Sequence, residues 1–333
     1  MKEFPPILLT SGEPAGVAPE ITGLAWQALR AKPACCFFLL GDADYWAARN
    51  RGLAVRQIES AGEAHSIFAT ALPVLSRPLP LHPAPGMIDP ATASDVIAAI
   101  DEAVALAFDG LVSAIVTNPV QKEVLYDAGF RHQGHTDYLA HLANLRGHAV
   151  QEVMMLVAKD LRAIPVTVHV PLAQVPHILT GDKIMNQARV VAAGLTRYFG
   201  IANPRLAFTG LNPHAGENAT IGTEERDIIA PALRQLAGEG FAVAGPLPAD
   251  TAFHAAARSQ YDAILCMYHD QALIPVKTLD FHGGINVSLG LPFIRTSPDH
   301  GTALDIAGAG SANPQSLIAA ISLAAQMARS PGA

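Results

Sequence analysis

The sequence predicts an α/β protein of two lobes, each an α/β/α arrangement. Short apolar runs alternate with segments of helical periodicity along most of the chain, which is typical of a sheet covered by helices. The chain has 333 residues, of which 50% are hydrophobic and 15% charged, enough apolar material for two cores. In such folds, ligands bind beyond the carboxyl ends of the strands. Functional side chains are therefore expected directly after apolar runs.

The first part of the chain is expected to alternate between strand and helix. Apolar residues at Val96, Ile100 and Val104 have helical spacing, whereas the shorter apolar runs are better suited to buried strands. The proline-rich stretch Leu72–Pro90 is interpreted as a long surface connection. We predict strands over Pro6–Thr10, Cys35–Leu40 and Leu111–Thr117, a loop over Gly12–Pro19, and helices near Glu20–Arg30 and over Thr92–Phe108.

The middle of the chain favours a hairpin. Two apolar runs, Val153–Ala158 and Ala163–Val170, are separated by a short polar segment, which indicates antiparallel strands. Regular alternation of strands and helices then resumes to the end of the chain. We predict further strands over Arg205–Gly210, Ala263–Met267 and Ile285–Leu289, and helices over Asp182–Phe199, Thr223–Leu236 and Gln315–Met327.

Composition argues against several classes of protein. Mean hydropathy is +0.26, but the longest strongly apolar runs, such as Ala34–Leu40, are too short to span a bilayer. The net charge of −7 and the lack of a Lys/Arg cluster argue against nucleic-acid binding. The three cysteines are best interpreted as buried reduced thiols. Because the N-terminus has no cleavable signal pattern, we expect a cytoplasmic protein without membrane contacts.

Three histidines follow apolar runs and are candidate metal ligands. They are His169, His214 and His269. Imidazole suits Zn²⁺, Co²⁺ and similar ions, and three imidazoles leave coordination positions open for a substrate. Asp250 and Asp270 are acidic residues near in sequence that could orient ligands or move protons. Any one of these histidines alone would more often be an ordinary core or surface residue.

A second group of residues could bind an anion. Lys277 and Arg295 follow strand-like runs, and Asn286 lies within one. His135 and Thr136 directly precede a helical pattern, where helix N-terminal amides favour anions. Taken singly, Lys277 is better interpreted as an ordinary surface charge and Arg295 as part of a structural salt bridge. No Gly-x-Gly-x-x-Gly follows the first strand, so a standard Rossmann dehydrogenase is disfavoured.

Together these segments resemble the 4-hydroxythreonine-4-phosphate dehydrogenase family of vitamin B6 biosynthesis. The resemblance covers nearly the whole chain. It lies in the segments 12–16, 134–136, 210–217, 247–251, 267–271 and 290–297. A wider resemblance, in the segments 300–303, 305–308 and 312–314, is to the cofactor loop of isocitrate and isopropylmalate dehydrogenases, which bind NAD(P) without a Rossmann motif.

The resemblance implies a fold, a cofactor, a metal and roles for individual residues. The fold would be isocitrate/isopropylmalate dehydrogenase-like, with a cleft between a first lobe of residues 1–130 plus 290–333 and a second lobe of residues 131–289. The chain would form a homodimer, with the third metal-binding histidine supplied by the partner subunit. The resemblance assigns one divalent metal (Zn, Mg or Co) to His169, His214 and His269. It assigns substrate contacts to His135, Thr136, Lys277, Asn286 and Arg295. It assigns NAD, with NADP as the alternative, to His300, Gly301, Thr302, Ala303, Asp305 and Asn313.

The implied reaction is oxidation of 4-phosphooxy-L-threonine at C3, followed by decarboxylation to 3-amino-2-oxopropyl phosphate. Lys277, Asp250 and Asp270 are the candidates for the proton acceptor. A close alternative is a dehydrogenase of D-erythronate or D-threonate 4-phosphate, because relatives take such substrates. A metal-dependent hydrolase and a phosphate-handling acyltransferase are alternatives from other classes. The resemblance at residues 300–314 argues against the hydrolase, and three histidine ligands argue against the acyltransferase.

Overall fold

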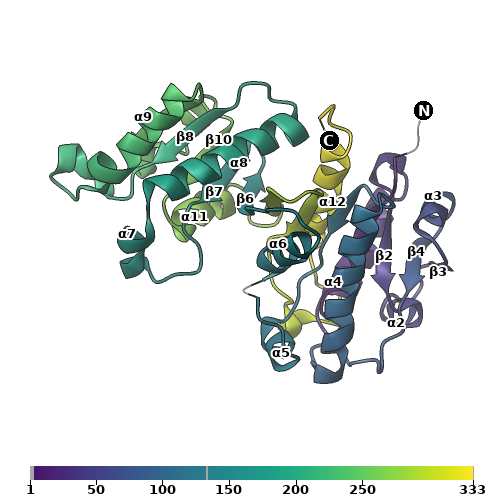
Figure 1. Ribbon diagram of the computed structural model, residues 1–333. Helices are drawn as coiled ribbons and strands as arrows, with labels where there is room; N and C mark the ends of the chain where they lie inside the picture. The colour runs from purple at the N-terminus through teal and green to yellow at the C-terminus, as the bar shows by residue number, and fades with distance from the viewer. Residues whose placement is uncertain (1–3, 133, 333) are drawn as a thin grey trace. The chain divides into compact units, whose positions relative to one another are not determined.

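The chain divides into two compact units. The computed structural model describes residues 4–132 and 134–332. Unit 1 comprises the chain up to Val150 together with Leu291–Arg329, and unit 2 comprises Gln151–Gly290 and the residues from Ser330 onward (Figure 1). Residues 131–150, which we expected in the second lobe, belong to unit 1 because helix α6 (His135–Leu145) packs against helix α4 (Ala93–Phe108) of that unit.

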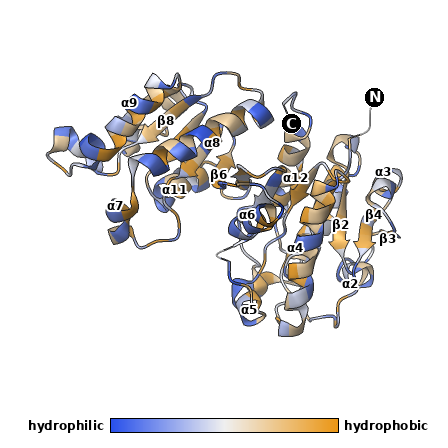
Figure 2. Ribbon diagram, viewed as in Figure 1, coloured by the Kyte–Doolittle hydropathy of each residue, from blue (hydrophilic) through white to orange (hydrophobic). Residues whose placement is uncertain are grey.

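Unit 1 contains a parallel sheet buried on both faces. Its strand order is β3-β4-β2-β1-β5-β12, and all the neighbouring pairs are parallel. Leu8 and Leu9 are successive residues that point to opposite faces, and both are fully buried, so both faces are covered. Figure 2 shows β2 coloured as apolar. The strands are β1 (Ile7–Thr10), β2 (Phe37–Gly41), β3 (Val55–Ile58), β4 (Leu72–Ser76), β5 (Ala114–Val116) and β12 (Arg295–Pro298).

The helices of unit 1 pack against this sheet. Helix α4 contacts β1, β2 and β5, whereas α12 contacts β1, β5, β12 and helix α1. Asp42 caps α2 by accepting a hydrogen bond from the Tyr45 amide. The helices are α1 (Ala18–Leu29), α2 (Ala43–Arg49), α3 (Ala64–Ile67), α4, α5 (Lys122–Asp127), α6 and α12 (Gln315–Met327), with short 3₁₀ turns at Pro33–Cys35, Ala61–Glu63, Pro90–Thr92 and Leu304–Ile306.

Unit 2 contains a mixed sheet. Its strand order is β11-β6-β7-β10-β8-β9. The pairs β11–β6 and β6–β7 are antiparallel, and the remaining pairs are parallel. The expected hairpin is therefore confirmed. The strands are β6 (Val153–Ala158), β7 (Leu161–Pro165), β8 (Arg205–Thr209), β9 (Ala242–Leu247), β10 (Ala263–Cys266) and β11 (Ile285–Leu289).

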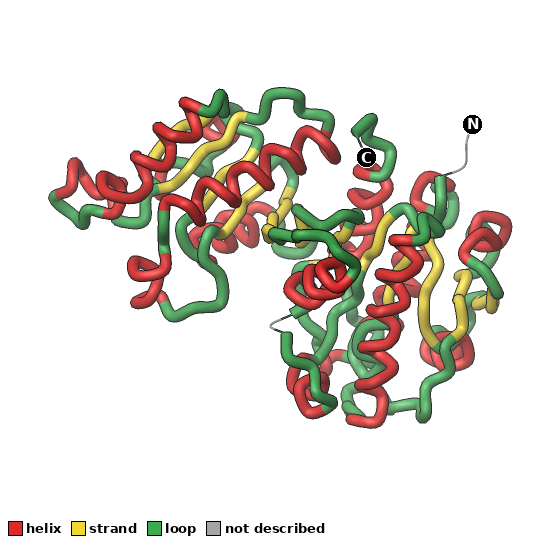
Figure 3. The backbone as a smooth tube through the Cα atoms, in the orientation of Figure 1, coloured by secondary structure: helices red, strands yellow, loops and turns green. Residues whose placement is uncertain are grey.

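Helices also flank the sheet of unit 2, as Figure 3 shows for each unit. Helix α8 begins after Thr180, whose hydroxyl accepts from the Lys183 amide, and ends at Gly200, whose φ of 69° is readily adopted by glycine. Helix α11 covers β6, β7 and β10. The helices are α7 (Val175–Ile178), α8 (Gly181–Phe199), α9 (Ala230–Gly238), α10 (Ala255–Arg258) and α11 (His269–Leu279), with 3₁₀ segments at Leu172–Gln174 and Ala249–Thr251, a turn with positive φ within Pro213–Ala219 and a π-helical turn at Glu225–Ile229.

Two sequence-based expectations were wrong in part. The stretch Leu72–Pro90 is not wholly a surface connection, because Leu72–Ser76 forms the buried strand β4 between β2 and β3. Lys277 does not follow a strand: its apolar neighbours Ile274–Val276 lie in helix α11, which contains Pro275. In both places the density of proline and short apolar runs gave an ambiguous local signal. No helix in the described parts of the chain is long and apolar enough to cross a membrane.

Candidate active site

Arg295 is the centre of a polar cluster in unit 1. It is the first residue of β12 and only 3% exposed. Its guanidinium donates hydrogen bonds to the hydroxyl oxygens of Thr117, at 2.6 Å, and Thr136, at 3.4 Å. Burial lowers the pKa of Arg295 to about 9, which leaves the group charged at neutral pH. Hydroxyl partners orient the guanidinium without neutralising its charge, so the cluster is suited to an anion.

His135 lies beside Arg295 as the first residue of helix α6. Its Nε2 atom is buried and has no hydrogen-bond partner among the described residues. Burial, followed by the positive charges of Arg295 and Lys122, lowers the pKa of His135 to about 3. The ring is therefore neutral at pH 7, with one nitrogen able to donate and the other to accept. A buried polar atom without a partner points to a ligand at this position.

The expected cofactor loop, residues 300–314, is packed against the first loop of unit 1. The Val17 amide donates to the Thr302 carbonyl at 3.0 Å, and the Thr302 hydroxyl donates to Gln121 at 3.1 Å. A Cβ atom on Gly16 would lie only 2.7 Å from the Thr302 carbonyl oxygen, so only glycine permits this approach. The segment 12–16 is thus a packing partner of the 300–314 loop, which accounts for Gly16 without a phosphate-binding motif.

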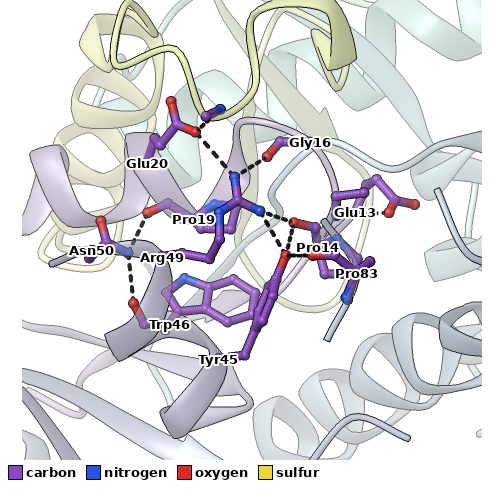
Figure 4. A network of polar contacts seen from close by, with 12 residues as sticks. Glu13, Pro14, Gly16, Pro19, Glu20, Tyr45, Trp46, Arg49, Asn50 and Pro83 are labelled. Atoms are coloured by element: carbon purple, nitrogen blue, oxygen red, sulfur yellow. Dashed lines mark hydrogen bonds and ion pairs between the residues drawn. The ribbon is translucent and has the colours of Figure 1, made fainter. Parts of the chain in front are cut away.

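A half-buried arginine, Arg49, fixes this first loop (Figure 4). Arg49 donates to the Pro14 carbonyl at 3.0 Å, to the Gly16 carbonyl at 3.3 Å and to the Glu20 carboxylate at 3.1 Å. The hydroxyl of Tyr45 also donates to the Pro14 carbonyl, at 2.8 Å. Glu20 in turn accepts a hydrogen bond from the Gly308 amide. Arg49 and Glu20 together therefore connect the first loop to the 300–314 loop, a connection that local sequence patterns did not suggest.

In unit 2, two of the three expected metal ligands lie together. The ring centroids of His169 and His269 are 5.5 Å apart. Both residues line a pocket of about 250 Å³. The other lining residues are Thr167, Val168, Val170, Leu172, Val175, Tyr268 and Asp270. The Asp270 carboxylate lies 2.8 Å from Nδ1 of His269, so it can hold that nitrogen protonated and leave Nε2 free to bind a cation.

His214 is not among the residues that line this pocket. It lies in the segment Pro213–Ala219, in which His214 and the next residues have positive φ, 52° at His214 itself. In the described part of the single chain, no group of three or more His, Cys, Asp or Glu side chains is arranged to hold a metal ion. The cluster of three imidazoles is therefore not formed within one chain as described.

Buried side chains connect the strand ends that carry these histidines. Gln271 accepts from the Met267 amide and the Thr209 hydroxyl, both at 2.7 Å, and donates to the Gly210 carbonyl at 2.8 Å. The Thr167 hydroxyl donates to the Met267 carbonyl at 2.8 Å. The ends of β7, β8 and β10 are thus fixed to one another. The sequence analysis did not predict a role for Gln271 or Thr167, although Gln271 lies in a segment that carries the family resemblance.

The His214 loop has its own buried anchor. Glu225 is 6% exposed and accepts from the backbone amides of Leu211 and Asn212, each at 2.7 Å. The Asn212 side chain donates to Glu225 at 2.9 Å and to Glu224 at 2.7 Å. A Cβ on Gly216 would lie 2.5 Å from a Glu225 carboxylate oxygen, so the loop wraps closely around this carboxylate.

The remaining predicted site residues also lie in unit 2. Asn286 is in β11, and its Oδ1 is buried with no hydrogen-bond partner among the described residues. Lys277 is half-buried in α11, with its ammonium 5.5 Å from the Phe281 ring centroid. Asp250 is exposed in the 3₁₀ turn Ala249–Thr251. Of the acidic candidates, only Asp270 lines the pocket with His169 and His269.

Comparison with known proteins agrees with this picture. The family model described as pyridoxal phosphate biosynthetic protein PdxA matches residues 33–324. A 4-hydroxythreonine-4-phosphate dehydrogenase of Bradyrhizobium diazoefficiens is 51% identical over 97% of both chains. The crystal structure of the Klebsiella pneumoniae enzyme of that name has a TM-score of 0.85 and 37% identity, covering 98% of this chain and 100% of that one.

A more distant solved structure defines the wider class. A terephthalate 1,2-cis-dihydrodiol dehydrogenase from Burkholderia xenovorans has a TM-score of 0.65 and 27% identity, and covers 97% of this chain and 98% of that one. The fold and its relatives thus define an α/β dehydrogenase. Within that class, the chain belongs to the PdxA family of pyridoxal phosphate biosynthetic proteins.

Proposed function

We propose that this protein oxidises 4-phosphooxy-L-threonine at C3 with NAD⁺ and so triggers its decarboxylation to 3-amino-2-oxopropyl phosphate. The observation that carries the proposal is the nearly full-length similarity to enzymes named 4-hydroxythreonine-4-phosphate dehydrogenase. The residue types support it: unit 1 has a charged, buried arginine beside a neutral imidazole, and unit 2 has paired imidazoles lining a pocket. Function rests on these groups and not on the fold alone.

Unit 1 supplies the groups that bind an anionic part of the substrate. Arg295, oriented by Thr117 and Thr136, would neutralise one charge. The neutral ring of His135 would donate a hydrogen bond from its buried Nε2 to a substrate oxygen. In unit 2, Lys277 and Asn286 remain proposed substrate contacts. Because Arg295 is held by hydroxyls on two other segments, it needs little rearrangement on binding, which favours productive orientation.

Unit 2 supplies the groups that fit a divalent cation. His269 is held by Asp270 in the tautomer that a metal ligand requires, and the ring of His169 faces it. A cation bound there would lower the pKa of the substrate hydroxyl and stabilise the negative charge formed on oxygen during oxidation and decarboxylation. We propose that His214 completes the ligand set in a homodimer, with one of the three imidazoles supplied by the partner subunit. The proton acceptor is proposed to be Asp270, Lys277 or Asp250.

The 300–314 loop is proposed to bind NAD⁺, which accepts the hydride from C3. His300, Gly301, Ala303, Asp305 and Asn313 are exposed or half-buried on this loop, whereas Thr302 is buried and anchors it. The two contacts of Thr302 hold the loop in place before the cofactor binds. Such pre-organisation reduces the ordering cost of binding.

The direct test is growth of NADH absorbance when the protein is mixed with NAD⁺ and 4-phosphooxy-L-threonine, with and without a chelator. We expect turnover that the chelator abolishes and an added divalent metal restores. D-threonate 4-phosphate and D-erythronate 4-phosphate serve as comparison substrates. Higher kcat/KM on either of these acids would contradict the proposed substrate, and turnover unaffected by chelation would contradict the metal.

A further inference from the structure

A third basic side chain lies at the anion cluster of unit 1. Lys122 is the first residue of α5 and is exposed. Among the described residues, no hydrogen bond or ion pair to its ammonium is found. Most exposed lysines are simply solvated. The position of Lys122 relative to the neighbouring helix distinguishes it from them.

The ammonium of Lys122 reaches the N-terminus of helix α6. A Cβ placed on Gly134 would lie 3.7 Å from Nζ of Lys122 and 3.6 Å from its Cε. Gly134 directly precedes His135 and Thr136, which are the first two residues of that 11-residue helix. The positive charge of Lys122 also acts on the His135 ring, together with that of Arg295. Side chains from α5, α6 and β12 therefore lie around the same position, the N-terminus of helix α6.

The combined chemistry of this place favours a phosphate over a carboxylate. A single arginine fork suffices for a carboxylate with one negative charge. A phosphate monoester carries a charge of about −1.5 to −2 and three acceptor oxygens. Arg295 and Lys122 together supply two positive charges, and Thr136, His135 and the N-terminal end of the α6 helix add donors. Among the described residues, the buried Nε2 of His135 has no hydrogen-bond partner, which is an independent sign of a ligand-binding position.

We propose that Lys122 is a further phosphate ligand of this site, and that it makes the enzyme select a phosphorylated acid over its unphosphorylated counterpart. The proposal rests on the proposed function, because it assumes that the substrate carries the phosphate. Lysine suits this role as a compact point charge that can approach a phosphate oxygen from solvent, while the buried arginine provides fixed orientation. Lys122 is thus a specificity residue that the sequence patterns did not indicate.

The test compares Lys122→Met and Lys122→Arg with the control Lys32→Met, which changes an exposed lysine of the same unit. Because a hydrogen bond to a charged group is lost, Lys122→Met should raise the KM for 4-phosphooxy-L-threonine and the inhibition constant of inorganic phosphate by roughly 10- to 100-fold. The KM for NAD⁺ and kcat should change less than about threefold, a change of under 1 kcal/mol. Lys122→Arg should restore most of the affinity. The preference for 4-phosphooxy-L-threonine over 4-hydroxy-L-threonine should fall in parallel with the loss of affinity.

Two results would overturn the proposal. One is an unchanged KM and phosphate inhibition constant in Lys122→Met. The other is a loss of activity that Lys122→Arg does not rescue and that leaves phosphate affinity intact, which would mean a structural role. Calorimetric titration of wild type and Lys122→Met with inorganic phosphate requires no turnover. If the wild-type protein fails to reduce NAD⁺ with the substrate, the proposed function fails, yet this titration still decides whether Lys122 binds phosphate.

Discussion

The protein holds the side chains of Arg295 in unit 1 and His214 in unit 2 in two different ways. Arg295 begins a buried parallel strand and is oriented by hydroxyls from two other segments of its own unit. His214 is exposed on a loop with positive φ, and only its backbone surroundings are anchored, through Glu225. The anion cluster is therefore assembled within one chain, whereas the three-histidine cluster is not. Binding of an anion should consequently depend on the fold of unit 1 alone, whereas the proposed metal site would depend on the proposed dimer as well.

Replacing Arg295 should produce the largest effect, because the anion loses a buried, pre-oriented charge. We expect Arg295→Met to lower kcat/KM by roughly 10²- to 10³-fold, the equivalent of about 3–4 kcal/mol. Arg295→Lys should recover little, since a lysine cannot reproduce the fork that contacts Thr117 and Thr136. Steady-state kinetics and a thermal melt are the measurements, and Arg51→Met, an exposed arginine of the same unit, is the control. A loss below fivefold would remove Arg295 from the site.

His214→Ala tests the other half of the comparison. If His214 is one of three metal ligands, its removal should weaken binding of Zn²⁺ or Co²⁺ by about 100-fold. This is the upper end of the loss in metal affinity when a residue that hydrogen-bonds to a metal ligand is replaced. Calorimetric titration measures the affinity without turnover, and sedimentation checks the oligomeric state. His177→Ala, at an exposed histidine of α7, is the matched control. Normal turnover with an intact dimer and excess metal would remove His214 from the mechanism.

Glu20→Gln should affect the cofactor more than the substrate. The carboxylate accepts hydrogen bonds from both Arg49 and the Gly308 amide, so its neutralisation weakens the attachment of the 300–314 loop. We expect the KM for NAD⁺ to rise by about 10-fold, the value of one charge-assisted hydrogen bond, with little change in the KM for the phosphorylated acid. Glu59→Gln, at an exposed carboxylate, is the control. Equal changes in both KM values would instead indicate general loosening of unit 1.

The last prediction concerns the dependence of folding stability on pH. The pKa of His135 is lowered by burial to about 3 in the folded protein, against 6.5 for an unperturbed histidine. Below pH 6.5 the unfolded chain binds a proton that the folded chain does not, so stability falls as the pH drops toward 3, by up to about 1.4 kcal/mol per pH unit. Urea denaturation in phosphate-free buffer between pH 4 and 7 should show this slope, and His135→Asn should reduce it. An identical slope in both proteins would mean that His135 protonates freely.

Local patterns predicted much of the fold but less of the site. The strand β11 and the helix α12 have the predicted bounds, because each is bounded by clear turn signals and has consistent periodicity. The buried strand β4 was missed because prolines in and after Leu72–Ser76 suggested a loop. His135 and Thr136 were placed in the wrong lobe, because only the packing of α6 against α4 assigns residues 131–150 to unit 1.

The sequence by itself determined the alternation of strands and helices, the polar residues after apolar runs, and the family to which the chain belongs, since these are properties of short segments. Only the tertiary structure revealed Lys122 beside the start of α6, Gln271 joining the ends of β8 and β10, and Glu20 joining the 300–314 loop to Arg49. Each of these contacts brings together residues from separate segments of the chain. Contacts of this kind depend on how whole elements pack, which no local pattern of residue types encodes.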